Sequence, residues 1–319
     1  MNHKILVMLP RRLGDVVMCT PAFKQLKAHC PSLIVDALAF SKISATAIKH
    51  DPLFKTIFLA EQHPLASLHH HYDQVYSLYD SRTIYDYIGN YPVTYNRMRE
   101  HHGKTLHNAD MACVFLAKQF AYQPEAVQQY YIYPQQQDKD RLNTLLAATD
   151  IKPDNKLIGF HLGCSRSAKY ATRNRAWLLR YFRKYLKGIK SWPLNRYLKL
   201  ANNLRQDDPK VKIILTGGAD EIKLGEMFSK HYPDAINLIG KTSIQVLFEL
   251  LQRLNLYVAA DTGTLHVACA TNTPFITFFR SGKNNCVPPA ADYRVVIKKE
   301  KITDISVAEV YHHARRFLK

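Results

Sequence analysis

The sequence predicts an α/β protein of two halves, each built on a parallel sheet with helices on both faces. The chain has 319 residues, which is enough for about two domains. Short apolar runs alternate with helical patterns in both halves, and this alternation is typical of parallel sheets. A polar stretch separates the two series, so we expect a domain boundary near residue 150 and a cleft between the halves.

The first half, residues 1–150, begins with an apolar run of buried-strand length at residues 4–9. A tight turn at Gly14 leads into a helical pattern at residues 16–29. Further strands are expected at residues 33–40, 55–60 and 74–78, and further helices at residues 41–49 and 108–120.

The second half, residues 151–302, repeats the alternation. Strands are expected at residues 157–161, 211–215, 236–239, 256–260 and 275–279. Helices are expected at residues 193–204, from 220 onward, at 243–254 and from 263 to 269. Ser306 and Glu309 have the spacing of a capping box, which predicts a closing helix within residues 303–319.

The chain is strongly basic. It has 44 Lys and Arg against 26 Asp and Glu, a net charge of +18, and this favours association with polyanions. The candidates are nucleic acid, an anionic membrane face and a phosphorylated glycolipid. The sequence carries no signature of a nucleic-acid-binding module, so we expect no nucleic-acid partner. The six cysteines form no CxxC pair, and the N-terminus lacks a secretory signal, so we expect a cytoplasmic protein with reduced thiols.

The first motif that can carry chemistry is RRLGDVVMCTP, residues 11–21. Gly14 lets the chain turn sharply after the first strand, and Asp15 then lies at the start of a helix. Ligands of open α/β folds bind at the carboxyl edge of the sheet, where this carboxylate is expected. The alternative is that Asp15 only caps its helix. Arg11 and Arg12 beside it either meet anionic groups of a ligand or are surface charges.

The second motif is VAADTGTLHVACATNTP, residues 258–274, where an apolar strand leads into a helix. The N–H groups at the start of that helix form a natural diphosphate site. The residues placed there are Asp261, Thr262, Gly263 and Thr264, with His266 one turn further along. The alternative is an ordinary strand–turn–helix unit with a histidine of the core.

Two glycine turns complete the set. Gly163 and Ser165 follow one strand, and Gly217 follows another with Glu221 close behind. Glu221 either accepts hydrogen bonds from ribose hydroxyls or favours the N-terminus of its own helix. Each glycine turn by itself is a weak signal.

Together and in this order, these segments resemble glycosyltransferase family 9, the ADP-heptose:lipopolysaccharide heptosyltransferases. The family's R-x-L-G-D-V-x-x-T-P type of run is matched by residues 12–21. The family's glycine–serine turn is matched by residues 163–165, and its K-x-W-P element by residues 190–193. Its glycine pair followed by an acidic residue is matched by residues 217–221. Its D-T/S-G-x-x-H-x-A-x-A run is matched by residues 261–270.

The resemblance implies a GT-B fold of two Rossmann-like domains, with the acceptor on the first, the nucleotide-sugar on the second, and a closing helix that crosses back to the first. It implies an enzyme that moves a heptose from ADP-heptose to the inner core of lipopolysaccharide. We expect an inverting displacement with Asp15 as general base and with Lys190 and the N–H groups of residues 262–264 facing the leaving diphosphate. No cofactor is expected. The alternatives are another nucleotide-sugar, a protein acceptor, an inactive scaffold relative, or a non-enzymatic polyanion-binding protein.

Two departures from the family stand out. The glycine turn and K-x-W-P are separated by an insert, residues 166–188, which together with Lys190 holds nine Lys and Arg and no acidic residue. Its interleaved aromatic residues suit either peripheral contact with the cytoplasmic face of the inner membrane or a helix packed on its own domain. Residues 279–282, FRSG, stand where the family has an F-G-P-T/S turn.

A metal site is not expected. The histidines at 69–71 and 101–102 lack nearby ligands at a convincing spacing. Asp138, Lys139 and Asp140 form a DxD triplet, but it lies in a polar linker, where a solvated charge cluster is the simpler interpretation.

Overall fold

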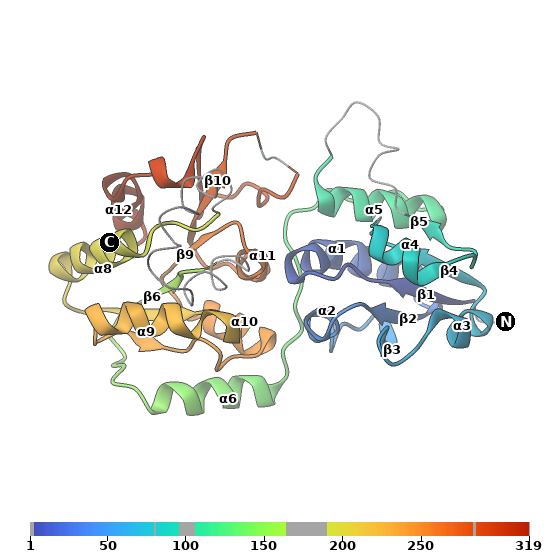
Figure 1. The fold of residues 1–319 in the computed structure, drawn as a ribbon, viewed down its shortest axis with the longest axis horizontal. Helices are drawn as coiled ribbons and strands as arrows, with labels where there is room; N and C mark the ends of the chain where they lie inside the picture. The colour runs from blue at the N-terminus through green and yellow to red at the C-terminus, as the bar shows by residue number, and fades with distance from the viewer. Residues whose placement is uncertain (1–2, 80, 96–105, 164–189, 283–284, 319) are drawn as a thin grey trace, which may run out of the picture. The chain divides into compact units, whose positions relative to one another are not determined.

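The computed structural model describes residues 3–79, 81–95, 106–163, 190–282 and 285–318. The chain divides into two compact units (Figure 1). The first is Met1–Tyr133 with Asn284–Pro289, and the second is Pro134–Lys283 with Ala290–Lys319. The segment at 285–289 therefore comes from the second half of the chain but packs within the first unit, where the Asn285 carbonyl accepts from the Asn108 N–H at 2.8 Å.

The first unit contains a five-stranded sheet in the order β3-β2-β1-β4-β5, and every pair of neighbours is parallel. The strands are β1 (Lys4–Met8), β2 (Ile34–Ala39), β3 (Phe54–Leu59), β4 (Gln74–Ser77) and β5 (Thr94–Tyr95). This is the strand order 3-2-1-4-5 of a Rossmann-like domain. The chain reverses direction across the sheet between β1 and β4, which is the switch point where such folds bind ligands.

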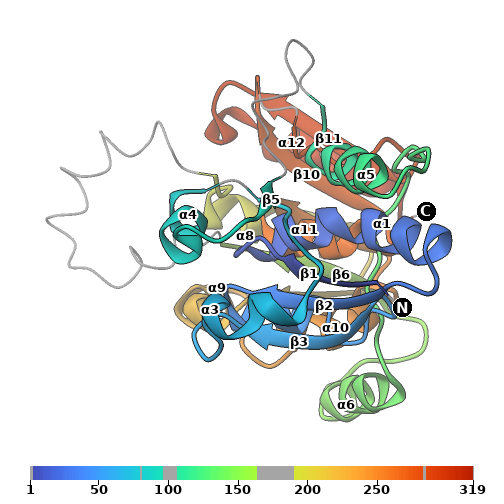
Figure 2. The same ribbon diagram turned by 90° about the vertical axis from the view of Figure 1, so that its right-hand side faces the viewer.

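Helix α1 (Leu13–His29) packs beside α5 (Asn108–Gln119) in this unit (Figure 2). Pro21 interrupts the hydrogen-bond ladder of α1 because it has no N–H to offer the carbonyl of Val17. The Thr20 hydroxyl donates to that carbonyl at 2.7 Å and so satisfies it. The smaller helices are α2 (Lys42–Ala47), α3 (Leu65–Leu68) and α4 (Arg82–Ile88), with a 3₁₀ turn η1 (His69–His71).

The second unit contains a six-stranded parallel sheet in the order β11-β10-β9-β6-β7-β8. The strands are β6 (Lys156–His161), β7 (Val211–Thr216), β8 (Ile236–Asn237), β9 (Leu256–Ala260), β10 (Phe275–Arg280) and β11 (Arg294–Lys299). Counted from β6, this is the complete Rossmann order 3-2-1-4-5-6, with its switch point between β6 and β9. The predicted α/β class with two parallel sheets is confirmed.

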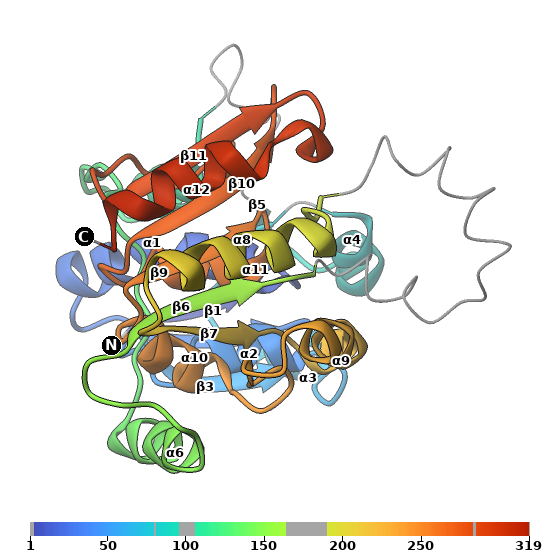
Figure 3. The same ribbon diagram turned by 90° about the vertical axis from the view of Figure 1, so that its left-hand side faces the viewer.

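Helices α8 (Leu194–Asp207) and α12 (Val307–Arg316) lie side by side on this unit (Figure 3). They close a core around Trp192, which is 1% exposed and donates its indole N–H to the Ile305 carbonyl at 2.9 Å. The remaining helices are α9 (Ile222–His231), α10 (Ile244–Leu251), α11 (Gly263–Ala268) and α6 (Gln136–Ala147), with 3₁₀ turns η2 (Ala219–Glu221) and η3 (Ile302–Asp304).

The closing helix α12 packs on the second unit. Its buried Val310 and Ala314 belong to the Trp192 core, and it contacts α8 and β10. That this helix crosses back to the first domain stays a prediction. Ser306 is the N-cap, as the sequence predicted, and its hydroxyl accepts from the Glu309 N–H at 3.1 Å.

Two elements run against expectation. The polar stretch before residue 150 holds α6, in which Asp138 accepts from the Gln135 N–H at 2.9 Å and Asp140 accepts from the Gln136 amide at 2.8 Å. The DxD acids therefore support the first turn of a helix. The sequence also did not predict β11, because three of its six residues, Arg294, Lys298 and Lys299, are basic.

Candidate active site

The second unit gathers most of the predicted site residues at the carboxyl edge of its sheet. Gly163 follows β6 and Asp261 follows β9, so the two motifs flank the switch point of a Rossmann-order sheet. Glu221 comes just after β7, the next strand outward from β6. Because parallel strands all end at the same edge, segments far apart in sequence meet there.

Lys190 and Asp261 form an ion pair in the second unit. The Lys190 ammonium lies 2.8 Å from Asp261 Oδ2. The carboxylate is 9% exposed while the lysine side chain is 42% exposed. Burial of the acid makes the pair costly to break, because an aspartate without its lysine would keep a buried charge. The exposed side of the ammonium can meet a further anion.

The segment after Asp261 starts helix α11. Thr262 is the N-cap, with extended backbone, and its hydroxyl shares a hydrogen bond of 3.0 Å with that of Thr264. The first N–H groups of a helix have no acceptor within the helix, and they point toward its N-terminal end. His266 is 3% exposed, as expected for a histidine of the core. It carries little accessible surface for direct contact with a ligand.

Glu221 occupies the space that two glycines leave open. Its carboxylate accepts a hydrogen bond from the Gly218 N–H at 3.0 Å. A Cβ on Gly217 would lie 2.5 Å from Glu221 Oε2, and one on Gly163 would lie closer still to Oε1. A side chain at either position would therefore displace the Glu221 carboxylate from where it lies. The two glycine turns, which were weak signals separately, turn out to enclose one buried carboxylate.

The sequence analysis missed three buried residues of this edge: His161, Thr216 and Tyr257. The His161 Nε2 lies 3.5 Å from Glu221 Oε1. The Tyr257 hydroxyl lies 3.1 Å from Thr216 Oγ1, with which it shares a hydrogen bond, and it is close to the side chain of Thr264. Burial raises the pKa of Tyr257 far above its ordinary value, so the phenol stays protonated. The signal that could have revealed Tyr257 is Gly159, a glycine inside a strand, which often marks a close approach.

Part of the donor motif lies outside the described residues. This applies to Ser165 and to the basic insert at 166–188. The K-x-W-P element is described: besides Lys190, it contributes Trp192 to the core and Pro193 as the N-cap of α8. The aromatic and proline positions of this element thus anchor the chain that presents the lysine.

In the first unit, Asp15 lies in the first turn of α1, directly after β1 and so at the switch point of that sheet. The N-cap of α1 is Arg12, so Asp15 is the third helical residue and does not occupy the cap position. Asp15 is half-buried, whereas Arg11 and Arg12 are exposed. The backbone of this turn is fixed by Ser41, whose hydroxyl donates to the Arg11 carbonyl at 2.7 Å.

No metal cluster is found within the described part of the chain: no three His, Cys, Asp or Glu side chains are grouped so that they could hold an ion. The His70 ring contacts the rings of His69 and His71, and the His69 ring also contacts Tyr91. Among the same residues, no helix combines the length and apolar character needed to span a bilayer.

Comparisons with known proteins agree with this geometry. The family model described as glycosyltransferase family 9 (heptosyltransferase) matches residues 111–309. Lipooligosaccharide heptosyltransferase 2 of Haemophilus influenzae is 29% identical over 34% of this chain and 32% of its own length. Lipopolysaccharide heptosyltransferase 2 of Escherichia coli is 26% identical over 39% of this chain and 38% of its own length. These two alignments thus span about a third of the length of those relatives. Lipooligosaccharide heptosyltransferase 2 of Haemophilus ducreyi is 25% identical over 92% of this chain and 88% of its own length.

Two solved structures share the fold along nearly the whole chain. A glycosyltransferase family 9 protein from Veillonella parvula has a TM-score of 0.75 at 16% identity, covering 99% of this chain and 97% of that one. ADP-heptose lps heptosyltransferase II from E. coli has a TM-score of 0.73 at 19% identity, covering 99% and 98%. These likenesses extend the agreement in fold to the first unit, most of which lies outside the family-model match.

Proposed function

The chain belongs to glycosyltransferase family 9, and from this premise we propose that it transfers a heptose from ADP-heptose to the inner core of lipopolysaccharide. The observation that carries the proposal is the polar edge of the second unit. The Lys190–Asp261 pair, the start of α11 and the enclosed Glu221 follow strands that end beside one switch point. That is where a Rossmann-order sheet takes a nucleotide. Residues 151–302 are therefore assigned to the donor and residues 1–150 to the acceptor.

Each donor-binding residue has a role that its surroundings support. The N–H groups of Thr262, Gly263 and Thr264 at the start of α11 face the diphosphate, and the Lys190 ammonium balances its charge. Glu221, held between Gly163 and Gly217, accepts from the ribose hydroxyls. Asp261 orients Lys190, and the buried His266 supports the start of α11 from within the core. Ser165 is also proposed to bind the donor, although it lies outside the described residues.

The transfer proceeds as one displacement with inversion at the anomeric carbon. Asp15 accepts the proton of the acceptor hydroxyl, and the oxygen forms its bond to the anomeric carbon as the bond to the diphosphate oxygen breaks. ADP leaves with the electron pair of that bond. Lys190 and the α11 N–H groups stabilise the charge that grows on it. A positioned base contributes about 10²- to 10⁴-fold in rate, and the half-buried Asp15 at the first switch point is that base.

The acceptor is an anionic glycolipid. Arg11 and Arg12 are exposed beside Asp15, and guanidinium groups bind phosphates and carboxylates in paired hydrogen bonds. The net charge of +18 suits an enzyme that works peripherally at the cytoplasmic face of the inner membrane, where its lipid substrate is held. No nucleic-acid partner and no cofactor are proposed.

The principal rival is a family member with another nucleotide-sugar or with a protein acceptor. One observation favours it: the chain has Arg280 and its neighbours where the family has an F-G-P-T/S turn, and Arg280 donates to the Glu300 carbonyl at 3.3 Å. This turn follows β10, which is the neighbour of β9 in the sheet. A changed turn beside the donor site can change which donor fits.

The deciding experiment measures binding and turnover together. Purified protein is titrated calorimetrically with ADP-heptose, ADP-glucose, UDP-glucose and GDP-mannose, and ADP release is then followed with a lipid A–core acceptor. The proposal predicts heat only with the ADP-linked sugars and release only with ADP-heptose and acceptor. Binding of a UDP- or GDP-linked sugar alone would support the rival donor. No binding of any nucleotide-sugar would overturn the enzymatic assignment in favour of a scaffold or a polyanion-binding protein.

A further inference from the structure

Tyr257 lies beneath the proposed diphosphate site although it cannot touch a ligand itself. It is the second residue of β9 and is fully buried. Its side chain points to the face of the sheet opposite the Trp192 core, because the alternate residues Leu256, Val258 and Ala260 all belong to that core.

The ring of Tyr257 reaches across the neighbouring strand. In the sheet Tyr257 is paired with Gly159 of β6, and a Cβ on Gly159 would lie 2.8 Å from the Tyr257 Cδ2. The ring passes over the glycine, and its hydroxyl arrives 3.1 Å from Thr216 Oγ1 at the end of β7. A single side chain therefore spans three strands, β9, β6 and β7. Gly159 is the residue that makes this crossing sterically feasible.

The same hydroxyl lies beside the start of α11. It is close to the side chain of Thr264, whose hydroxyl in turn lies 3.0 Å from that of Thr262. Hydroxyls from β7, β9 and α11 thus cluster at one point, and Glu221 lies close enough to Tyr257 to act on it electrostatically. A phenol held in this way restricts the rotamer of Thr264.

We propose that Tyr257 is a positioning residue for the donor: its hydroxyl, fixed by Thr216, holds Thr264 in the orientation that receives the diphosphate. This inference rests on the proposed function, and it adds a requirement on a residue that has no contact with the nucleotide. A preorganised threonine loses less side-chain entropy when the diphosphate binds than a free one does. Without the phenol, Thr264 samples other rotamers, and part of the binding free energy is lost.

The test is a pair of conservative deletions and their combination. Tyr257→Phe keeps the ring over Gly159 and removes only the hydroxyl. The fold is expected to survive, because the Thr216 hydroxyl keeps its hydrogen bond to the Phe160 carbonyl at 3.4 Å. The Thr264 hydroxyl likewise keeps its hydrogen bond with that of Thr262. Thr264→Val removes the hydroxyl through which Tyr257 acts. The double variant then reports whether the two side chains work together.

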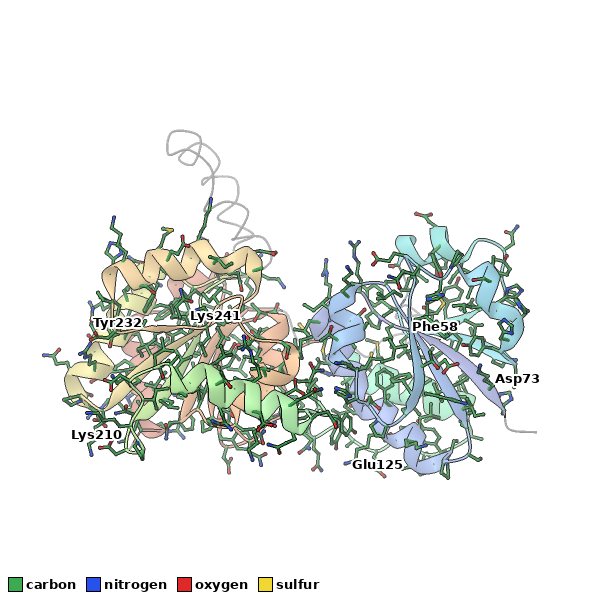
Figure 4. All side chains as sticks on the ribbon, turned by 90° about the horizontal axis from the view of Figure 1, so that it is seen from below. Phe58, Asp73, Glu125, Lys210, Tyr232 and Lys241 are labelled. Carbon is green, nitrogen blue, oxygen red and sulfur yellow. The ribbon has the colours of Figure 1, made fainter. Side chains whose placement is uncertain are left out.

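A matched control deletes the same atom elsewhere. Tyr232 is 4% exposed and lies at the C-terminal end of α9 in the second unit (Figure 4), where the Arg205 guanidinium lies 5.7 Å from the centre of its ring. Because α9 follows β7 and runs back along the sheet, its C-terminal end lies at the amino edge, away from the proposed donor site. Tyr232→Phe therefore removes a buried phenolic hydroxyl without disturbing α11.

The probe is ADP, titrated into each variant, followed by steady-state kinetics with ADP-heptose. For Tyr257→Phe we expect ADP affinity to fall about 3- to 10-fold, the KM for the donor to rise by a similar factor and kcat to change little. Tyr232→Phe is expected to bind as wild type does. The double variant is expected to bind about as weakly as Thr264→Val alone, and not with the product of the two losses.

The outcomes separate this inference from the function on which it rests. If wild type binds ADP and Tyr257→Phe binds it equally well, or if the two losses multiply in the double variant, the positioning role is overturned and the proposed function stands. If Tyr232→Phe loses as much affinity as Tyr257→Phe, the effect is one of general stability and the positioning role is also overturned. If wild type binds no ADP, the proposed function fails, and this inference fails with it.

Discussion

Glu221 lies so close to Gly163 that a side-chain carbon on residue 163 would come under 3.0 Å from its carboxylate oxygen Oε1. The two residues belong to different motifs, and neither motif alone indicates a buried carboxylate. Their contact makes the glycine a steric requirement of the acid, and this leads to a prediction with a built-in control.

Gly163→Ala is expected to displace Glu221 and to weaken ADP-heptose binding about 10-fold or more, because the acid can no longer reach the ribose in its enclosed position. Stability should fall as well, by on the order of 1–3 kcal/mol, as for other overpacked sites. Calorimetric titration and thermal unfolding measure the two effects.

The control is Gly218→Ala. A Cβ on Gly218 meets no atom within 4 Å, and the substitution keeps the N–H that donates to Glu221. This variant should bind and unfold as wild type does. Equal loss of binding in the two variants would show that the loop tolerates no alanine anywhere, and the steric account of Gly163 would be wrong.

The Lys190–Asp261 pair gives a second prediction. Lys190→Met should weaken ADP binding about 10- to 100-fold, because the diphosphate loses its cation and Asp261 keeps a buried charge near it. The wild-type affinity should fall as salt is added, and that of the variant should be less sensitive to salt. Titrations at low and high ionic strength measure both.

Lys212→Met is the matched control for this pair. Lys212 is also a lysine of the second unit paired with an aspartate, but Asp150 is 82% exposed and the separation is 3.4 Å. Removing such a surface pair should change little. If Lys212→Met weakened ADP binding as much as Lys190→Met, general charge loss would explain both results.

Asp51 predicts a pH dependence of stability in the first unit. Its Oδ1 accepts from the Leu53 N–H at 3.0 Å, its Oδ2 is buried without a partner among the described residues, and burial raises its pKa to about 6. The folded protein therefore holds the proton more tightly than the unfolded chain. Stability should fall as pH rises from about 4 to about 6, by on the order of 1–3 kcal/mol, and stay lower above that range.

Asp51→Asn should remove this slope, so that the variant is more stable than wild type at pH 8 and no more stable at pH 4. Asp154→Asn is the control, since Asp154 is 57% exposed and pairs at 3.1 Å with Lys210. Lys210 lies at the surface of the second unit (Figure 4). Urea unfolding at pH 4, 6 and 8 measures the difference. An unchanged slope in Asp51→Asn would mean that another group titrates.

Most of the fold could be predicted from the sequence because buried parallel strands are continuous apolar runs. Residues 256–260 were expected as a strand and form β9 at those bounds. Helix α6 was missed because a helix that packs on α10 through one fully buried residue, Leu142, has nearly the composition of a linker. Strand β11 was missed because its basic residues interrupt the apolar run by which the other buried strands were predicted.

The predicted site residues lie at strand ends because parallel topology itself brings those ends together. Asp261 and Glu221 were therefore expected from their positions after apolar runs. The supporting residues His161 and Tyr257 were not, since they lie inside strands and look like ordinary core residues in sequence. Only the pairing of Gly159 with Tyr257 reveals that the tyrosine crosses a strand.

The proposed transfer depends on Asp15 as its general base. Asp110 provides a matched comparison, because it is also an acidic residue in the first turn of a helix in the first unit and the third residue of that helix. Replacing either acid by asparagine removes the same favourable interaction with the helix dipole. A role in capping or stability alone therefore predicts equal effects of the two changes.

The decisive measurement is ADP release from ADP-heptose and a lipid A–core acceptor by wild type, Asp15→Asn and Asp110→Asn, with ADP-heptose affinity measured for each. If Asp15 is the base, Asp15→Asn binds the donor normally and loses about 10²- to 10⁴-fold in turnover, while Asp110→Asn turns over as wild type does. Turnover by Asp15→Asn within a few-fold of wild type would remove Asp15 from the chemistry.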